Sequence, residues 1–187
     1  MSIAGAFAAD KEVAFRPPPI ESFAHKQTNA QVTVAADPYN AGDKVRAAFG
    51  KLDPYEWGVL PVLVVIQNDS SQSIRLDRLK VEYNGPGGNK IVATPSRDVR
   101  YAKGPDRPSM VPGPTGGIKI GKGKKNPLTA WEIEGRAFSA QMLPPGQSAF
   151  GFFYFQTAIQ TGSTLYLNGM EEAKSGKELF YFDIPLQ

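Results

Sequence analysis

An uninterrupted apolar segment, VLPVLVVI from Val59 to Ile66, constrains the fold of this chain most strongly. A strand with one wet face carries polar residues at alternate positions, whereas this segment carries none, so both of its faces must be covered. It is also far shorter than the roughly 20 residues that a membrane-spanning helix needs. The segment therefore predicts a central strand inside a layered β fold.

Turn-forming residues separate the remaining apolar segments. Sixteen prolines and nineteen glycines in 187 residues favour short strands and tight turns over long helices. QVTVAA (31–36) alternates with Val32 and Val34 inward, and FGFFYF (150–155) predicts a core strand. We also expect a strand over LTAWEIEGRAFSAQML (128–143) and a last one over KELFYFDIPL (177–186), with Leu179, Tyr181 and Asp183 opposite Phe180, Phe182 and Ile184.

A short helix and a change of sheet are predicted near the central strand. Val45, Phe49 and Leu52 recur at helical spacing, and Gly50 is placed to end that helix. In IRLDRLKVEY (74–83) the alternation slips by one residue at Asp77-Arg78. A slip of this kind turns an apolar face outward unless the strand bulges or moves to another sheet.

Two segments resemble a known family. VLPVLVVIQNDSSQSIRLDRLKVEY (59–83) and MLPPGQSAFGFFYF (142–155) are similar to the immunoglobulin-like sandwich domains of exported bacterial proteins and lipoproteins. In these, an Asn/Asp-rich turn precedes a Leu-rich strand, and a Leu-x-Pro-Gly-x-Ser turn opens a late aromatic strand. The likeness covers residues 31 to 185 and brings no catalytic residues, and the long basic segment departs from it.

The chain is thus predicted to be all-β: an immunoglobulin-like antiparallel β-sandwich with one short helix and a long basic loop. We expect an irregular N-terminal arm over residues 1–30 and a single sandwich domain over 31–187, with the loop at about 95–127. The small-x-small sequence Ala6-Phe7-Ala8 resembles the end of a trimmed signal peptide, which favours an exported, periplasmic or envelope-associated protein over an ordinary Ala-rich N-terminus.

Positive charge is concentrated in the predicted loop. Between Arg97 and Lys125 lie eight basic and two acidic residues, whereas the whole chain carries only +3. Lys119, Lys122, Lys124 and Lys125 are candidate contacts for an anionic glycan, lipid headgroup or acidic protein, although a solvated loop is the simpler interpretation. The same stretch resembles a phosphate-binding P-loop, but Gly123 stands where that loop needs a hydroxyl, so we predict no nucleotide. Tyr101 is the one aromatic residue of the stretch, which is too few for stacking on bases, so the sequence argues against a nucleic-acid partner.

Aromatic and acidic residues supply the remaining candidates. Tyr55, Trp57 and Trp131 are candidate sugar-stacking rings, against the simpler interpretation that they cap the core. Two carboxylate pairs are candidates for acid/base chemistry: Asp53 with Glu56, and Glu132 with Glu134. The second pair can reach the separation that glycoside hydrolysis needs, as can any solvent-facing pair. We expect the second pair on the wet face of an edge strand, with Trp131 and Ile133 facing inward.

Metal and thiol chemistry have little support. The chain has no cysteine and one histidine, so thiolate nucleophiles and zinc clusters with several histidines are excluded. No residue is predicted to be catalytic and no cofactor or metal is expected. The function predicted from sequence is a non-catalytic binding or structural module of the cell envelope. The alternatives are a carbohydrate-binding module and a glycan-active enzyme that uses a carboxylate pair.

Overall fold

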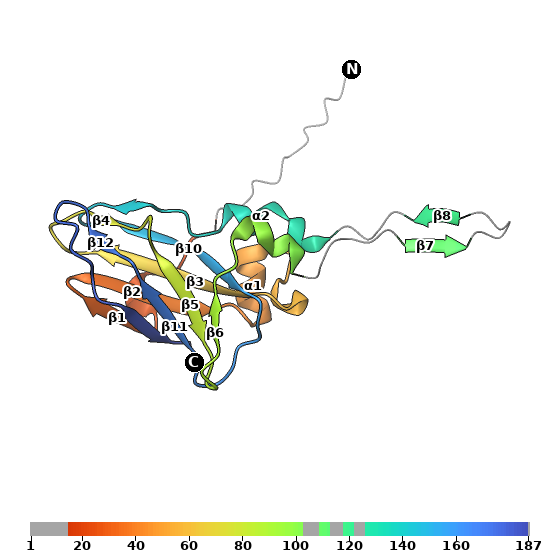
Figure 1. The fold of residues 1–187 in the computed structure, drawn as a ribbon, viewed down its shortest axis with the longest axis horizontal. Coiled ribbons are helices and arrows are strands. Elements are labelled where there is room, and N and C mark those ends of the chain that lie inside the picture. The colour runs from red at the N-terminus through yellow and green to blue at the C-terminus, as the bar shows by residue number, and fades with distance from the viewer. Residues whose placement is uncertain (1–14, 103–108, 113–117, 122–125, 187) are drawn as a thin grey trace, which may run out of the picture.

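The computed structural model of the protein describes residues 15–102, 109–112, 118–121 and 126–186 (Figure 1). Two four-stranded antiparallel sheets face each other. The inner sheet has the order β1–β2–β3–β10, with β1 Lys26–Asn29, β2 Val32–Pro38, β3 Leu60–Asn68 and β10 Ser148–Phe155. The outer sheet has the order β13–β11–β5–β6, with β13 Phe182–Pro185, β11 Thr164–Asn168, β5 Lys80–Asn84 and β6 Lys90–Val92.

Smaller elements complete the fold. A three-stranded sheet joins β12 Glu171–Glu172, β4 Ile74–Arg75 and β9 Met142–Leu143, and a separate hairpin pairs β7 Ser109–Pro112 with β8 Ile118–Gly121. The α-helices are α1 Gly42–Phe49 and α2 Trp131–Gly135. The short 3-10 helices are η1 Ile20–Ser22, η2 Tyr55–Trp57, η3 Ser96–Tyr101 and η4 Pro127–Thr129. In the described part of the chain, no helix is long and apolar enough to cross a membrane.

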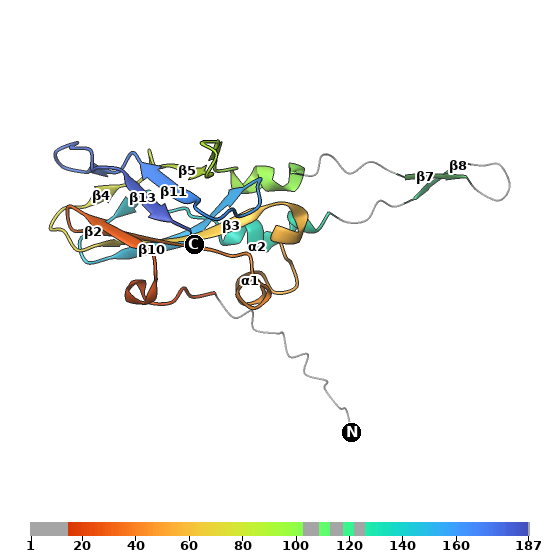
Figure 2. The same cartoon turned by 90° about the horizontal axis from the view of Figure 1, so that it is seen from below.

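The inner sheet is covered on both faces, as VLPVLVVI predicts. All but one residue of β3 are buried. Figure 2 shows β5 and β11 on one side of β3 and β10, and α1 on the other. The structure therefore confirms an antiparallel β-sandwich, to which a third layer of short helices and the N-terminal segment is added.

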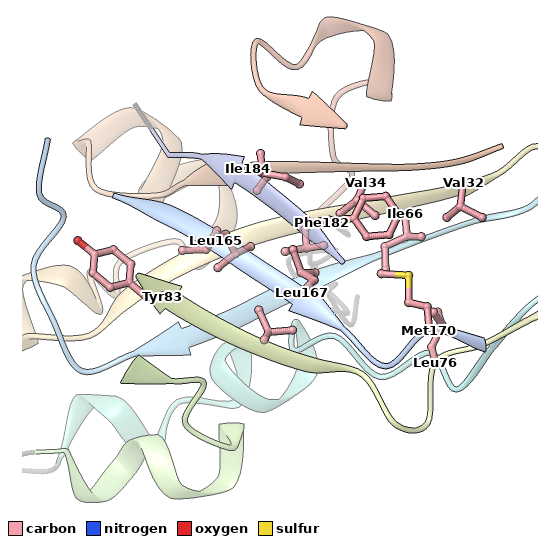
Figure 3. Close-up of a cluster of buried hydrophobic side chains, with 14 of the residues drawn as sticks. Val32, Val34, Ile66, Leu76, Tyr83, Leu165, Leu167, Met170, Phe182 and Ile184 are labelled. Atoms are coloured by element: carbon pink, nitrogen blue, oxygen red, sulfur yellow. The ribbon is translucent and has the colours of Figure 1, made fainter. Parts of the chain in front are cut away.

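The core between the two sheets is drawn from alternating residues of every long strand. Val34 and Ile66 of the inner sheet meet Leu165, Phe182 and Ile184 of the outer sheet (Figure 3). All five are at most 1% exposed. At about 1.5–3 kcal/mol for each fully buried aliphatic or aromatic side chain, this layer supplies much of the driving force for folding.

A second apolar layer lies between the inner sheet and the helices. Phe49 of α1 packs against Phe152 of β10, with ring centroids 4.8 Å apart, and Leu63 of β3 joins the same cluster. The predicted helix is confirmed, because its apolar stripe faces this layer and it ends at Gly50, whose φ of 64° a residue with a side chain rarely adopts. The aromatic strand is confirmed as well, although Phe150 is 44% exposed.

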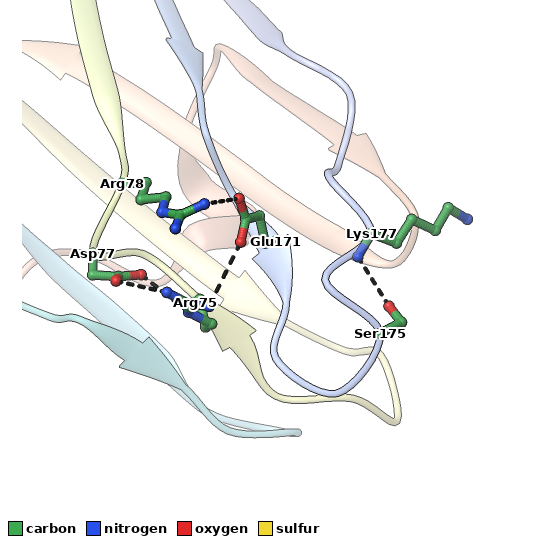
Figure 4. A network of polar contacts seen from close by, with 6 residues as sticks. All are labelled: Arg75, Asp77, Arg78, Glu171, Ser175 and Lys177. Atoms are coloured by element: carbon green, nitrogen blue, oxygen red, sulfur yellow. Dashed lines mark hydrogen bonds and ion pairs between the residues drawn. The ribbon is translucent and has the colours of Figure 1, made fainter.

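The phase slip at Asp77-Arg78 marks a change of sheet. β4 belongs to the three-stranded sheet and β5 to the outer sheet. Charged side chains hold the connection: the Arg75 guanidinium donates to Asp77, and Arg78 lies 3.0 Å from a carboxylate oxygen of Glu171 on β12 (Figure 4). The Arg75 hydrogen bond lowers the pKa of the Asp77 carboxyl.

Three sequence predictions are wrong in detail. The regular sheet begins inside the predicted irregular arm, because β1 (Lys26–Asn29) pairs with β2. The segment predicted as a strand from residue 128 instead forms η4 and α2, so the fold has a second short helix. The last strand alternates only from Phe182 onward: Leu179 is buried, whereas Phe180 is 77% exposed.

Candidate functional site: a cleft between two tryptophans

A cleft of about 720 Å³ opens where the helical layer meets the end of the sandwich. One wall comes from the turn after α1 and from η2, and the other comes from η4 and α2. Its lining contains both tryptophans of the chain, Trp57 and Trp131, although they are 74 positions apart in the sequence. The charged residues in the lining are Lys51, Asp53, Glu56 and Glu132.

The η2 wall is shaped by a capping carboxylate. Asp53 Oδ1 accepts the backbone N–H groups of Tyr55, at 2.9 Å, and Glu56, at 3.4 Å, which fixes the start of the 3-10 turn. The turn ends at Gly58, which has a φ of 75°. Trp57 is half-buried on the cleft side of this turn. A fixed backbone of this kind limits the positions open to the indole.

The η4 wall begins at an asparagine. Asn126 Oδ1 accepts the N–H of Leu128 at 3.0 Å, and its amide nitrogen donates to the carbonyl of Arg100 at 2.7 Å. The side chain therefore caps η4 and ties it to η3 at the same time. Leu128 and Ile133 point into the apolar layer below, at 2% and 1% exposure. These two anchors turn the intervening Trp131 toward solvent.

Trp131 is 50% exposed, but its ring is held in place. The Arg136 guanidinium lies 5.6 Å from the ring centroid, within the range of a cation–π contact. The ring also covers Gly135, where an added Cβ atom would come within 2.7 Å of the indole carbons. An exposed ring fixed on one face suits the binding of a ligand on the other face, because little side-chain entropy remains to be lost.

Helix α2 is fastened to β10 through two contacts below the cleft. The Tyr154 hydroxyl donates to the carbonyl of Ile133 at 2.8 Å, and burial raises the pKa of this tyrosine. After the helix, the chain crosses the edge of β10, where Phe152 N–H donates to the Arg136 carbonyl and Phe138 N–H donates to the Phe152 carbonyl. This crossing requires Gly151, because a Cβ atom there would lie 2.4 Å from the Cα of Phe138.

The structure separates one predicted carboxylate pair, Glu132 with Glu134, and keeps the other, Asp53 with Glu56, together. Glu132 lines the cleft with Asp53 and Glu56, whereas Glu134 forms an ion pair with Arg100 and lines a different groove. The prediction that Glu132 and Glu134 share the wet face of a strand is wrong, because residues 131–135 are helical. With three carboxylates and a single lysine, the cleft carries negative charge.

The predicted aromatic residues also divide. Trp57 and Trp131 share the cleft, so the expectation that Trp131 faces inward is wrong. Tyr55 instead packs against the core between the sheets, and its hydroxyl accepts the N–H of Ile159 at 3.2 Å. Core capping, the simpler interpretation of these rings, describes Tyr55 and in part Trp57, which also packs against the apolar layer between the inner sheet and the helices.

The basic segment contains regular structure that the sequence did not indicate. Its first part is η3, and Lys119 lies in β8, opposite Val111 of β7. Lys122, Lys124 and Lys125 lie outside the described residues. The described residue that follows them is Asn126, so this excursion returns to the sandwich at the rim of the cleft.

Comparisons with known proteins find structures similar to this chain but assign it to no family. No family model matches the chain, and no curated protein matches it. Among solved structures, it is similar to the yjhA protein of Bacillus subtilis, with 10% identity, a TM-score of 0.43, and coverage of 88% of this chain and 98% of that one.

Two further solved structures are similar to this chain. A putative lipoprotein, ycdA, of Bacillus subtilis has 12% identity and a TM-score of 0.39; the match covers 86% of this chain and 38% of that one. An uncharacterised β-sandwich protein of Clostridium difficile has 11% identity and a TM-score of 0.30, with 84% and 88% covered. The assignment as a β-sandwich rests on the sheet order and register of the chain itself.

Proposed function

We propose that this protein is a non-catalytic binding module and that its cleft binds a short stretch of glycan. The observation that carries the proposal is the convergence of Trp57 and Trp131 on one cleft together with Asp53, Glu56 and Glu132. Sugar rings combine apolar C–H faces with hydroxyl edges. Aromatic rings match the faces, and carboxylates, which only accept hydrogen bonds, match the hydroxyls.

The charge of the cleft narrows the class of glycan. Three carboxylates face one lysine, Lys51, so an acidic sugar meets repulsion there, whereas a neutral or amino sugar does not. A sugar that carries an ammonium group gains further from the indole faces. The ligand proposed for the cleft is therefore a neutral or amino-bearing oligosaccharide.

Intrinsic fluorescence tests this proposal directly, because Trp57 and Trp131 are the only tryptophans of the chain and both line the cleft. Titration with soluble neutral, amino-bearing and acidic oligosaccharides is expected to give a saturable change with the first two classes. Trp131→Ala should weaken binding about tenfold or more, which corresponds to about 1.4 kcal/mol.

The matched control for this titration is Met142→Ala. Met142 has the same 50% exposure as Trp131 but lies on β9 of the three-stranded sheet. Its replacement should leave both the fluorescence change and the affinity as in the wild type. The proposal fails if no oligosaccharide class changes the fluorescence, or if calorimetry shows that Trp131→Ala binds as tightly as the wild type.

A second candidate function, glycoside hydrolysis, is favoured by the meeting of Glu132 with Asp53 and Glu56 in one cleft. Hydrolysis needs two carboxyl groups roughly 5–10 Å apart on either side of the scissile bond. Asp53 already accepts two backbone N–H groups, which leaves Glu56 and Glu132 as the candidate pair. Release of reducing ends from a bound oligosaccharide, abolished by Glu132→Gln, would replace the non-catalytic proposal with this one.

An envelope location and an immunoglobulin-like form of the sandwich are part of the same proposal. Their support is the Ala6-Phe7-Ala8 pattern and the resemblance of residues 59–83 and 142–155 to exported sandwich domains. Fractionation of cells that express the native gene should place the protein outside the cytoplasm, and its recovery with cytoplasmic enzymes alone would contradict the location.

A further inference from the structure

The outer sheet leaves one face uncovered. Leu165 and Leu167 of β11 point into the core, so Tyr166 between them points away from it, and in the described part of the chain no helix packs on that side (Figure 2). The register places Tyr166 opposite Glu82 of β5 and Asp183 of β13, and Glu82 opposite Val92 of β6. One row of side chains thus runs straight across four strands.

Two tyrosines form an aromatic pair on this face. The rings of Tyr166 and Tyr181 are stacked, with centroids 5.4 Å apart and planes inclined by 27°. Tyr181 is 55% exposed, and Val92, at the other end of the row, is 67% exposed. At this centroid separation the rings are offset, so each keeps part of its face open to a ligand.

The backbone that carries Tyr181 is fixed on both sides. Its carbonyl accepts the side-chain amide of Asn29 at 3.1 Å, and Asp183 N–H donates to Gln27 Oε1 at 2.8 Å. Phe182, the next residue, is fully buried in the core. The stacked pair is therefore presented by a rigid frame, which reduces the entropy that binding would cost.

The charges of this face balance. Lys80 and Glu82 alternate with the buried Val81 of β5, and Asp183 lies between the buried Phe182 and Ile184 of β13. Lys90 pairs with Asn84, which is on the same face of β5 as Glu82. All four charged side chains therefore lie on the outer face of the sheet. A face without net charge gives no long-range attraction to a polyanion or a polycation. A neutral partner that presents a flat apolar surface edged with hydroxyl groups complements it.

We propose that this surface is a second binding surface and that it takes an extended neutral polysaccharide chain. The surface, called the tyrosine face, is formed by Tyr166, Tyr181, Val92, Glu82, Asp183, Lys80 and Lys90. The face extends across the four strands of the outer sheet, whereas the cleft is a concave pocket, so the face suits a long chain and the cleft suits a short one. The proposal is independent of the cleft, because the cleft is lined by turns and short helices, whereas the tyrosine face lies on the outer sheet, and the two share no residue.

Depletion of the protein from solution by insoluble cellulose and by chitin tests the tyrosine face. The wild type should be retained by at least one of them, and the double variant Tyr166→Ala/Tyr181→Ala should bind about tenfold more weakly or worse. Tyr166→Phe/Tyr181→Phe keeps the rings and should retain most of the binding. Met142→Ala, an exposed apolar residue on another sheet, is the control for general loss of surface hydrophobicity.

Trp131→Ala separates the two surfaces. If the tyrosine face acts by itself, adding Tyr166→Ala/Tyr181→Ala to this cleft variant still weakens retention by the insoluble polysaccharide about tenfold, whatever the cleft contributes. Wild-type retention by the double alanine variant would overturn the proposal, and so would failure of the wild type to bind either polymer. A dimer in sedimentation velocity that the alanine variant abolishes, without polysaccharide retention, would overturn it in favour of a second copy of this chain.

Discussion

The two main sheets differ in how many of their faces they bury. In β3 of the inner sheet all residues but one are buried, whereas β11 of the outer sheet alternates between half-buried and buried positions. The inner sheet lies between the outer sheet and a helical layer; the outer sheet lies between the core and solvent (Figure 2). Stability is therefore expected to depend mainly on the inner sheet. The two proposed binding surfaces lie outside it, one among the short helices and the other on the solvent-facing side of the outer sheet.

The largest expected effect breaks the packing of the inner sheet. Phe152 is 1% exposed and its ring contacts those of Tyr39 and Phe49. Phe152→Ala should lower the free energy of unfolding by about 3–5 kcal/mol, because it removes the buried ring and leaves a cavity. Tyr166→Ala on the outer sheet should cost at most about 1 kcal/mol. Urea unfolding followed by circular dichroism measures both, and equal losses would contradict the comparison.

A second effect concerns the crossing of the chain over the edge of the inner sheet. Gly151→Ala places a methyl group against the backbone of Phe138 and should cost about 1–3 kcal/mol. Since the displaced segment follows α2, the variant should also weaken glycan binding in the cleft. Gly87→Ala is the matched control, because nothing lies within 4 Å of its added methyl group. Similar stability of the two variants would show that the close approach is relaxed in solution.

A smaller effect tests how the cleft wall is held to the inner sheet. Tyr154→Phe removes the hydroxyl that donates to the Ile133 carbonyl and should cost about 1–2 kcal/mol, because a buried carbonyl loses its donor. The emission of Trp131 on the same helix should shift as the wall loosens. Unchanged fluorescence with unchanged stability would mean that packing alone positions α2.

The smallest effect belongs to the charged connection beside the outer sheet. The folded state lowers the pKa of Asp77, so its ionised form contributes stability above the ordinary pKa of 3.8, and this contribution is lost as the pH falls through the lower folded value. Asp77→Asn should therefore lower the melting temperature slightly at pH 7. The difference from the wild type should narrow below about pH 4. A constant difference between pH 7 and pH 3 would exclude a role for this ionisation.

Much of the inner sheet could be predicted from the sequence, because its signals are local. The apolar run from Val59 to Ile66 requires two covered faces, and the stripe of Val45 and Phe49 requires a helix against one of them. The phase slip at Asp77-Arg78 identifies the change of sheet. Each of these patterns depends on the spacing of apolar residues within a single segment, and tertiary packing preserves the local structure that this spacing predicts.

The cleft wall could not be predicted in the same way. Glu132 and Glu134 alternate with Trp131 and Ile133, so the sequence favours a strand. The alternation covers only a few residues, and the strand preference of so short a segment is weaker than the tertiary contacts around it. Burial of Leu128 and Ile133 beneath a short helix, with Asn126 as a cap, decided the outcome. The Asn-Pro start of η4 is a signal that could have indicated this turn, because Asn caps helices and Pro fits their first position.

By itself, the sequence determined the class of fold: short strands, a central strand buried on both faces, one amphipathic helix, and no residues for thiol or zinc-cluster chemistry. The tertiary structure alone decided which candidate residues meet. It brought Trp57 and Trp131 into one cleft, turned Tyr55 into the core, and sent Glu134 to Arg100. The physical reason is that the spacing of apolar residues determines secondary structure over a few residues, whereas a binding surface is formed by contacts between segments distant in sequence.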